Sequence, residues 1–272
     1  MTDGELLGLP FFRREAGMIM RQMNPKDRPC ALFDGRVPTR SELRLLVDRG
    51  YGLRLIAVPR DHADLRFLEG VELIQLEIVG ADLDTRVVSR MVSLIRLELS
   101  LVDDSVTDLS GLPRLQRFSG FLSGCESVFR APALEVAALQ EVWQGALPAI
   151  PETIVELSLM DARNVRSLSS DGPNPALERL VIGSARVFDV GSLAPFSRLH
   201  LLHLDHVRKV EGIAAVNSLP IRQLGFVSCR EIVDADSLRE LTGAVVGVSG
   251  KLSASLRDIA EDSPSEWHFY RS

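Results

Sequence analysis

The chain has 272 residues, and 31 Lys and Arg against 37 Asp and Glu give it a formal charge of −6 at pH 7. This balance argues against a nucleic-acid partner and against an anionic membrane, which usually need a basic surface, although it leaves room for a local basic patch. Hydrophobic residues make up 46% of the chain, but no run approaches the roughly 20 residues of a membrane span. The first 20 residues also lack the pattern of a signal peptide.

The three cysteines, Cys30, Cys125 and Cys229, lie far apart and show no paired spacing. Such spacing favours neither a disulfide framework nor a zinc site. We therefore expect a cytoplasmic protein with free thiols, without a metal and without a cofactor.

Residues 1–52 are expected to form an N-terminal cap. Thr39 is followed three residues later by Glu42, the spacing of a capping box. Leu43 and Leu46 then fall on one helical face, and Gly50 is a typical C-terminal stop. The segment predicts an amphipathic helix that covers the first coil of the domain that follows.

A pattern of apolar residues at positions 1, 4 and 6 recurs from residue 53 onward. Clear copies begin at Leu53, Leu73, Leu94, Leu134, Ile154, Leu177, Leu199 and Ile221, and weaker copies begin at Leu115 and Gly243. Successive starts are 19 to 23 residues apart, a register that an ordinary Leu-rich sequence would not keep.

Each copy predicts a short strand followed by a tight turn. In the copy that starts at Leu199, Leu202 and Leu204 face inward and His203 faces outward, because side chains alternate along a strand. Beyond the strand, apolar residues occur at every third position, as at Val207 and Val210. That period favours 3-10 turns over an α-helix.

The pattern resembles that of the leucine-rich-repeat family, whose L-x-x-L-x-L motif and period of 20 to 29 residues it matches. Within that family it is similar to the short bacterial, internalin-like class. The resemblance implies an α/β solenoid, the horseshoe fold, with a parallel concave sheet of about ten short strands, an irregular 3-10 convex side and helical end caps. The solenoid would span residues 53–250. The ninth position departs from the family, because small apolar residues such as Cys229 replace Asn there, and we expect Cys229 to be buried and inert.

Residues 251–272 are expected to form the C-terminal cap. Leu252, Leu256 and Ile259 indicate a short amphipathic helix, and an aromatic tail with Trp267 and Tyr270 follows. The tail covers the last coil, since an exposed strand edge invites aggregation; a partner-binding tail is the alternative.

Outward strand positions are the candidate partner-binding residues. One group is a charged cluster of Gln75, Glu77, Arg96, Glu98 and Arg117. This cluster indicates either cross-strand ion pairs or a partner contact. A second group consists of Glu156, Ser158, Met160, Arg179, His203 and Asp205. In the first copy, which begins at Leu53, the same alternation of side chains predicts that Leu55 also faces outward.

His203 and Asp205 share one face but do not suggest a metal site. The residues beside them in neighbouring coils, Val181, Gly183, Gly225 and Val227, cannot act as ligands. The glycines should instead leave both side chains standing in a shallow depression. Trp143 and Phe121 are further candidate contacts, with burial in the core as the alternative for Phe121.

The sequence contains no catalytic motif. We therefore expect a monomeric, non-enzymatic module that binds a protein partner on its concave face. The alternative function is that of an inhibitor or immunity protein that neutralises a toxin or an enzyme.

Overall fold

The computed structural model describes residues 11–22, 28–102, 106–143, 147–172 and 175–270. The chain divides into two compact units, Met1–Leu134 and Glu135–Ser272, here called unit 1 and unit 2. Each unit is described by itself. Among the described residues, no helix has the length and apolar composition needed to cross a bilayer.

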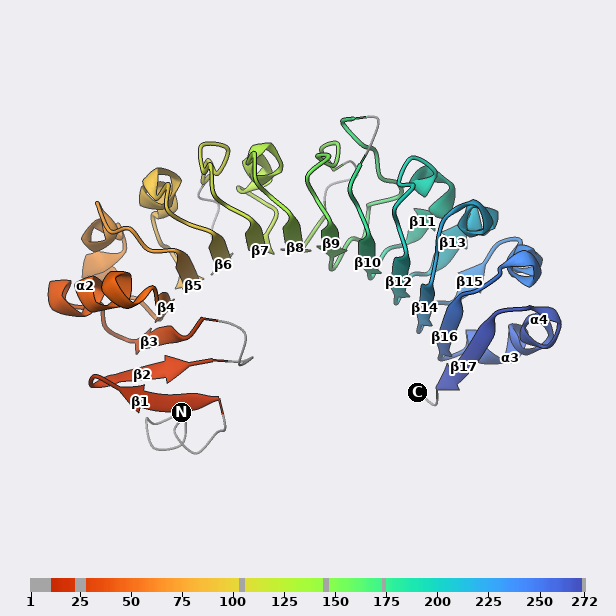
Figure 1. The fold of residues 1–272 in the computed structure, drawn as a ribbon, viewed down its shortest axis with the longest axis horizontal. Helices are drawn as coiled ribbons and strands as arrows, with labels where there is room; N and C mark the ends of the chain where they lie inside the picture. Colours follow the sequence, from red (N-terminus) through yellow and green to blue (C-terminus); the bar gives the residue numbers. More distant parts are fainter. Residues whose placement is uncertain (1–10, 23–27, 103–105, 144–146, 173–174, 271–272) are drawn as a thin grey trace. The chain divides into compact units, whose positions relative to one another are not determined.

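Unit 1 begins with three strands that precede the predicted repeats (Figure 1). β1 (Phe12–Glu15) and β2 (Met18–Arg21) are antiparallel, and β2 is also antiparallel to β3 (Cys30–Asp34). From β3 onward the pairing is parallel, through β4 (Gly52–Ile56), β5 (Gln75–Ala81), β6 (Arg96–Val102) and β7 (Arg117–Phe121). The segment expected to act only as a cap therefore supplies the first parallel strand of the sheet.

Helix α2 (Arg40–Arg49) lies between β3 and β4, where the sequence predicted it. Thr39 and Glu42 form the expected capping box, and Gly50 ends the helix in the left-handed conformation with φ 63°. Leu43 and Leu46 are buried on the inner face of the helix. The predicted helix is confirmed.

The strands of unit 1 are joined by short 3-10 turns. These turns are η1 (Arg60–His62), η2 (Arg66–Leu68), η3 (Thr85–Arg90) and η4 (Glu126–Arg130). They place Leu68, Val88 and Val128 in the core, with no measurable exposure. The predicted preference for 3-10 turns over α-helices is confirmed here.

The predicted register of the first repeat is wrong by three residues, because Leu53 rather than Ile56 pairs with Leu76. Leu53 and Leu55 are both fully buried, whereas Arg54 and Ile56 are partly exposed. The reason is β3, which pairs the buried Ala31 with Leu53 and thereby turns the odd positions of β4 inward. Leu55 is thus a core residue, and Arg54 takes the outward position opposite Glu77 on β5.

Unit 2 is built around a parallel sheet (Figure 1). Its strands, in order, are β8 (Val136–Gln140), β9 (Glu156–Leu159), β10 (Arg179–Gly183), β12 (Leu201–Asp205), β14 (Gln223–Val227), β16 (Val245–Ser249) and β17 (Glu266–Tyr270). A second parallel sheet consists of β11 (Val187–Asp189), β13 (Lys209–Glu211) and β15 (Glu231–Ile232). The aromatic tail therefore adds a strand along β16, which the sequence did not predict.

The other elements of unit 2 are short. They are the 3-10 turns η5 (Val190–Leu193), η6 (Ile213–Ser218) and η7 (Ala235–Glu240) and the helices α3 (Leu252–Ser255) and α4 (Arg257–Asp262). Leu252, Leu256 and Ile259 of the predicted C-terminal helix are buried.

The core of each unit consists of the inward strand residues. In unit 1, Leu76 and Leu97 pair across β5 and β6; in unit 2, Leu180, Leu202 and Leu224 pair across β10, β12 and β14. All five side chains are at most 1% exposed. This register, in which successive coils each add one parallel strand to the main sheet of their unit, is the leucine-rich-repeat fold that the sequence predicted.

The chain leaves its strands through residues in the left-handed conformation. In unit 2, Asp161, Ser184, His206 and Ser228 have φ between 50° and 60°. The small apolar residue that follows is buried, and at Cys229 the thiol donates to the Leu204 carbonyl at 3.3 Å. Cys229 therefore satisfies a backbone group at the position where the family commonly has Asn, and its predicted burial is confirmed.

Candidate protein-binding surface

The predicted charged cluster of unit 1 is brought together on adjacent strands. Gln75 pairs with Arg96, Glu77 pairs with Glu98, and Arg96 pairs with Arg117. The strands thus place all five side chains on the sheet face that points away from the core, here called the outer sheet face.

Two members of this cluster are buried rather than exposed. Gln75 is 7% exposed and Glu77 is 4% exposed. Arg21 from the β1–β2 hairpin and Arg54 from β4 extend over Glu77 and cover its carboxylate. The expectation that Gln75 and Glu77 are available to a partner is therefore wrong.

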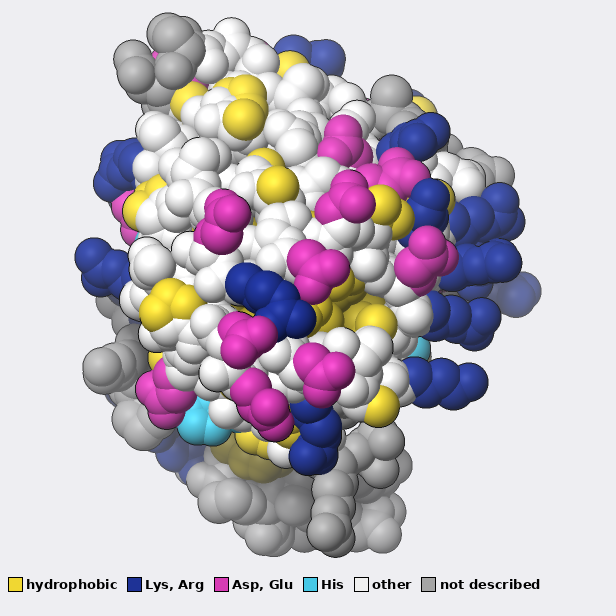
Figure 2. All heavy atoms as spheres, turned by 90° about the vertical axis from the view of Figure 1, so that its right-hand side faces the viewer, with side chains coloured by type: hydrophobic (Ala, Val, Ile, Leu, Met, Phe, Trp, Pro, Cys, Tyr) yellow, Lys and Arg dark blue, Asp and Glu magenta, His cyan; other side chains and the backbone are white. Residues whose placement is uncertain are grey.

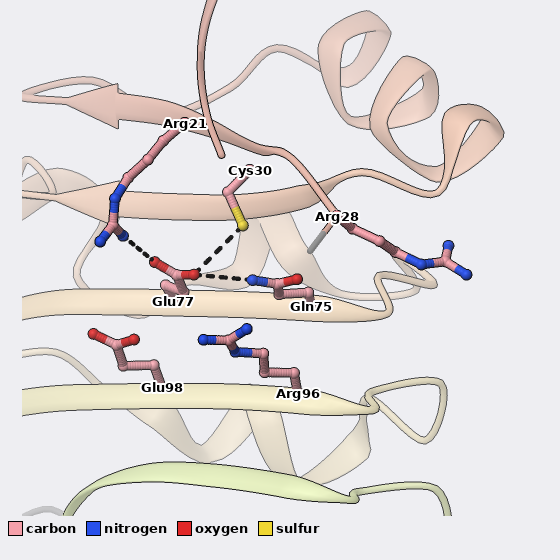
Figure 3. A pocket seen from close by; sticks show the side chains of 7 residues that line it. All are labelled: Arg21, Arg28, Cys30, Gln75, Glu77, Arg96 and Glu98. Atoms are coloured by element: carbon pink, nitrogen blue, oxygen red, sulfur yellow. Dashed lines mark hydrogen bonds and ion pairs between the residues drawn. The ribbon is translucent and has the colours of Figure 1, made fainter. Parts of the chain in front are cut away.

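The Glu77 carboxylate has four hydrogen-bond partners, most of which are drawn in Figure 3. Oε2 accepts from Arg21 Nη1 at 3.0 Å and from Arg54 Nη1 at 2.5 Å. Oε1 accepts from Gln75 Nε2 at 2.9 Å and from Cys30 Sγ at 3.5 Å. We call these five residues the Glu77 centre.

The charges of the Glu77 centre shift two pKa values in opposite directions. Burial raises the pKa of Glu77, but the hydrogen bond and charge of Arg54, with Gln75 and Arg21, outweigh burial and hold it below its ordinary value. Burial and the Glu77 carboxylate both raise the pKa of the Cys30 thiol far above its ordinary value. Glu77 is thus ionised and Cys30 is a neutral, unreactive thiol at pH 7.

A small pocket lies beside this centre, lined also by Arg28, Arg96 and Glu98 (Figure 3). Its volume of about 50 Å³ holds a few water molecules but no organic ligand. The geometry therefore gives Glu77 a structural role, because the carboxylate binds the N-terminal hairpin to the sheet through Arg21. Arg96, Glu98 and Arg117 remain the exposed or partly exposed members of the predicted cluster.

In unit 2 the remaining predicted contact residues also share the outer sheet face. Glu156 pairs with Arg179 across β9 and β10, and Ser158 of β9 is partly exposed. Arg179 Nη1 lies 3.5 Å from Glu156 Oε1, with side chains 52% and 45% exposed. An ion pair this open to solvent contributes little to stability, so both groups remain available to a partner.

Met160 and His203 each lie over a glycine of the next strand. A Cβ built on Gly183 would come within 2.8 Å of Met160 Cε, and a Cβ on Gly225 would overlap Nδ1 of His203. The glycines therefore accept neighbouring side chains instead of leaving an open depression. The sequence predicted that Gly183 and Gly225 would leave a shallow depression around His203 and Asp205. This prediction is wrong, because Met160 and His203 fill the space over the two glycines.

Asp205 has its close contact with His206 and not with His203. Asp205 Oδ1 lies 2.6 Å from Nδ1 of His206, the residue at the corner after β12. Within the described ranges, no three His, Cys, Asp or Glu side chains gather as metal ligands would. His203 is thus a partly exposed residue on the outer sheet face, and its role in partner contact stays a prediction.

The two aromatic residues predicted as further contacts, Phe121 and Trp143, belong to different units. Phe121, at the end of β7 in unit 1, is partly exposed. Trp143 of unit 2 is 56% exposed. Neither ring is a fully buried core residue.

Sequence reasoning missed three residues of the Glu77 centre: Arg21, Cys30 and Arg54. Arg21 and Cys30 precede the repeats, so the period carries no information about them. Arg54 was hidden by the register error in the first copy. A signal did exist for Arg54, because it is the polar residue between two leucines of a strand.

No protein-family model matches the sequence, and no curated protein matches it significantly. Among solved structures, an internalin (InlF) of Listeria monocytogenes is similar over 89% of this chain and 82% of that chain. The two chains are 15% identical, with a TM-score of 0.48. The leucine-rich-repeat assignment rests on the register and burial of this chain's own strands.

Proposed function

We propose that the protein is a non-enzymatic binding module that recognises a protein partner through the outer sheet face of unit 2. The observation that carries the proposal is a set of partly exposed apolar side chains on this face: Met160, Val181 and Leu201. Val181 pairs with His203, and Leu201 pairs with Arg179. An apolar centre bordered by charged and polar groups is the composition of a protein interface.

The strands hold these side chains in place before a partner arrives. β10 is paired on one side with β9 and on the other with β12. Met160 is in addition packed over Gly183, where a Cβ would have no room. Binding to such a surface loses little conformational entropy, because few groups have to be ordered.

Charged residues of both signs lie beside this apolar centre, because Arg179 pairs with both Leu201 and Glu156. Glu156 and Arg179 supply both signs in unit 2, and the outer sheet face of unit 1 separately presents Arg96, Glu98 and Arg117. Charges at the rim of an interface mainly set the association rate and its salt dependence. Gln75 and Glu77 are excluded from this role because they are buried.

The proposal of a non-enzymatic role is supported by the geometry around the histidine of this face. His203 lies over Gly225, whereas Asp205 is bound by His206. The two side chains therefore do not form an acid–base pair. The three cysteines are free and buried, which removes them as nucleophiles and fits a reducing compartment.

The test is affinity purification from the native host with two matched variants as bait. Leu201→Asp places a charge in the apolar centre, and Ala194→Asp places the same charge at an exposed residue after η5. We expect a stoichiometric partner that is retained by Ala194→Asp and lost by Leu201→Asp. Loss with Ala194→Asp alone would refute the assignment of the face. Stoichiometric inhibition of the recovered partner would identify an inhibitor instead of a scaffold.

A further inference from the structure

Unit 2 carries an arginine at the same position of four successive coils. These are Arg163, Arg186, Arg208 and Arg230, here called the arginine ladder. Each follows the buried small residue after a strand, namely Ala162, Ala185, Val207 or Cys229. All four arginines are exposed. They lie beyond the carboxyl ends of the strands, and therefore outside the outer sheet face.

Backbone pairing keeps the arginine ladder in register. The amide of Arg186 donates to the Arg163 carbonyl at 3.3 Å. Val187 then pairs with Lys209, and Lys209 pairs with Glu231, so Arg208 and Arg230 continue the row. Strands that pair in this way are about 4.8 Å apart, and three such steps span roughly 14 Å.

The guanidinium groups of the ladder are not neutralised within the described part of the chain. Of the ion pairs and side-chain hydrogen bonds found there, none involves these four groups. An adjacent row behaves differently: Arg166 lies 3.0 Å and Lys209 2.8 Å from the carboxylate of Glu211. Like charges at neighbouring positions of paired strands repel each other. Repulsion between the arginines of the ladder therefore lowers the stability of the fold, whereas the adjacent row contains opposite charges that attract.

An exposed aromatic residue occupies the same position one coil earlier. Val136 pairs with Glu156, which places Trp143 opposite Arg163. Asn164 Nδ2 donates to the Trp143 carbonyl at 2.7 Å and holds this segment beside the next coil. Figure 2 shows a column of Lys and Arg side chains along its right-hand edge, the arrangement that a one-per-coil ladder produces.

We propose that the arginine ladder binds an extended acidic segment of a protein. Guanidinium groups bind carboxylates through two parallel hydrogen bonds. An extended peptide rises about 3.3 Å per residue, so roughly five residues cover the ladder, with alternate side chains on one side. Trp143 would cover an apolar residue at the end of the segment. This surface is additional to the outer sheet face and does not depend on the function proposed for it.

The charge of the chain favours a short acidic peptide over a nucleic acid. The protein carries a formal charge of −6, which repels a long polyphosphate outside the ladder. A peptide with two or three carboxylates can be neutralised by the ladder alone. A single-stranded nucleic acid would use the same arginines and stack on Trp143, so the experiment must separate the two.

The test measures fluorescence anisotropy of three labelled probes: a ten-residue Glu-Ser repeat peptide, the matching Gln-Ser peptide and a ten-nucleotide oligothymidine. We expect only the Glu-Ser peptide to bind, with an affinity that falls as salt rises. Arg208→Glu should weaken this binding about ten-fold. Arg222→Glu is the matched control, because Arg222 is also exposed but precedes β14 at the opposite end of the strands. It should change the affinity less than about two-fold.

Three results would overturn the proposal: equal affinity for the Glu-Ser and Gln-Ser peptides, equal losses for Arg208→Glu and Arg222→Glu, or tighter binding of the oligothymidine through the same arginines. Leu201→Asp should leave peptide binding unchanged, which separates this surface from the outer sheet face. Thermal melts of each variant verify folding, since all the substituted arginines are exposed.

Discussion

Arg54 and Glu77 occupy paired positions on β4 and β5, and Arg54 Nη1 lies 2.5 Å from Glu77 Oε2. Their side chains are only 17% and 5% exposed. Arg21 reaches the same carboxylate oxygen from the β1–β2 hairpin. One buried carboxylate therefore connects the N-terminal hairpin with the first strands of the repeats.

Replacing Glu77 with Gln should destabilise the protein by about 3 kcal/mol, because it leaves two largely buried guanidinium groups without their anion. Urea denaturation measures the loss. The matched control is Glu156→Gln, whose ion pair with Arg179 is exposed and should contribute less than about 1 kcal/mol. Equal losses for the two variants would show that the Glu77 centre has no special structural role.

The contribution of Glu77 should depend on pH. Its pKa in the folded protein lies below the ordinary value of 4.5, so the unfolded chain binds the proton more tightly. The stabilisation is therefore present above pH 4.5 and is lost as the pH falls through the lower, folded pKa. Urea melts of the wild type and Glu77→Gln should differ at pH 7 and converge in acid. A difference that does not change with pH would contradict this assignment.

Gly120 should not tolerate a side chain. A Cβ at this position of β7 would overlap the Leu99 carbonyl oxygen on β6, so the two strands would have to separate. Gly120→Ala should cost at least about 2 kcal/mol in a thermal or urea melt. Gly111 is the matched control, because a Cβ there meets no atom within 4 Å. A stable Gly120→Ala variant would disprove the close approach of these strands.

The thiols should be inert in the folded protein. Cys30, Cys125 and Cys229 are buried, and burial is the main cause that raises the pKa of Cys125 to about 12 and of Cys229 to about 11. Because the thiolate is the reactive form, a disulfide reagent at pH 8 should label none of the three quickly. All three should react once urea unfolds the chain. Rapid labelling of one native thiol would identify a coil that opens locally.

Residues that obey the repeat period could be predicted from the sequence alone. Leu180, Leu202 and Leu224 are buried as expected, since the alternation of a strand follows directly from the spacing of its apolar residues. The capping box of Thr39 and Glu42 was also readable, because its partners are three residues apart. Local spacing determines both features.

The arginine ladder was readable in the same way, because Arg163, Arg186, Arg208 and Arg230 each follow the small residue after a strand. The ladder was not among the predicted contacts, which were the outward strand positions, nearby aromatic residues and the C-terminal tail. Its exposure and lack of ion pairs required the structure, since the adjacent Arg166 is paired with a carboxylate two coils away.

Tertiary structure alone decided the burial of Glu77. The sequence places Glu77 at an outward position, and the strand register agrees. Arg21, however, reaches it across 56 residues of chain, and no period relates the two. Likewise, β3 set the register of β4 and turned Leu55 into the core. Periodicity specifies which way a side chain points from its own strand, whereas burial also depends on what the rest of the chain lays over it.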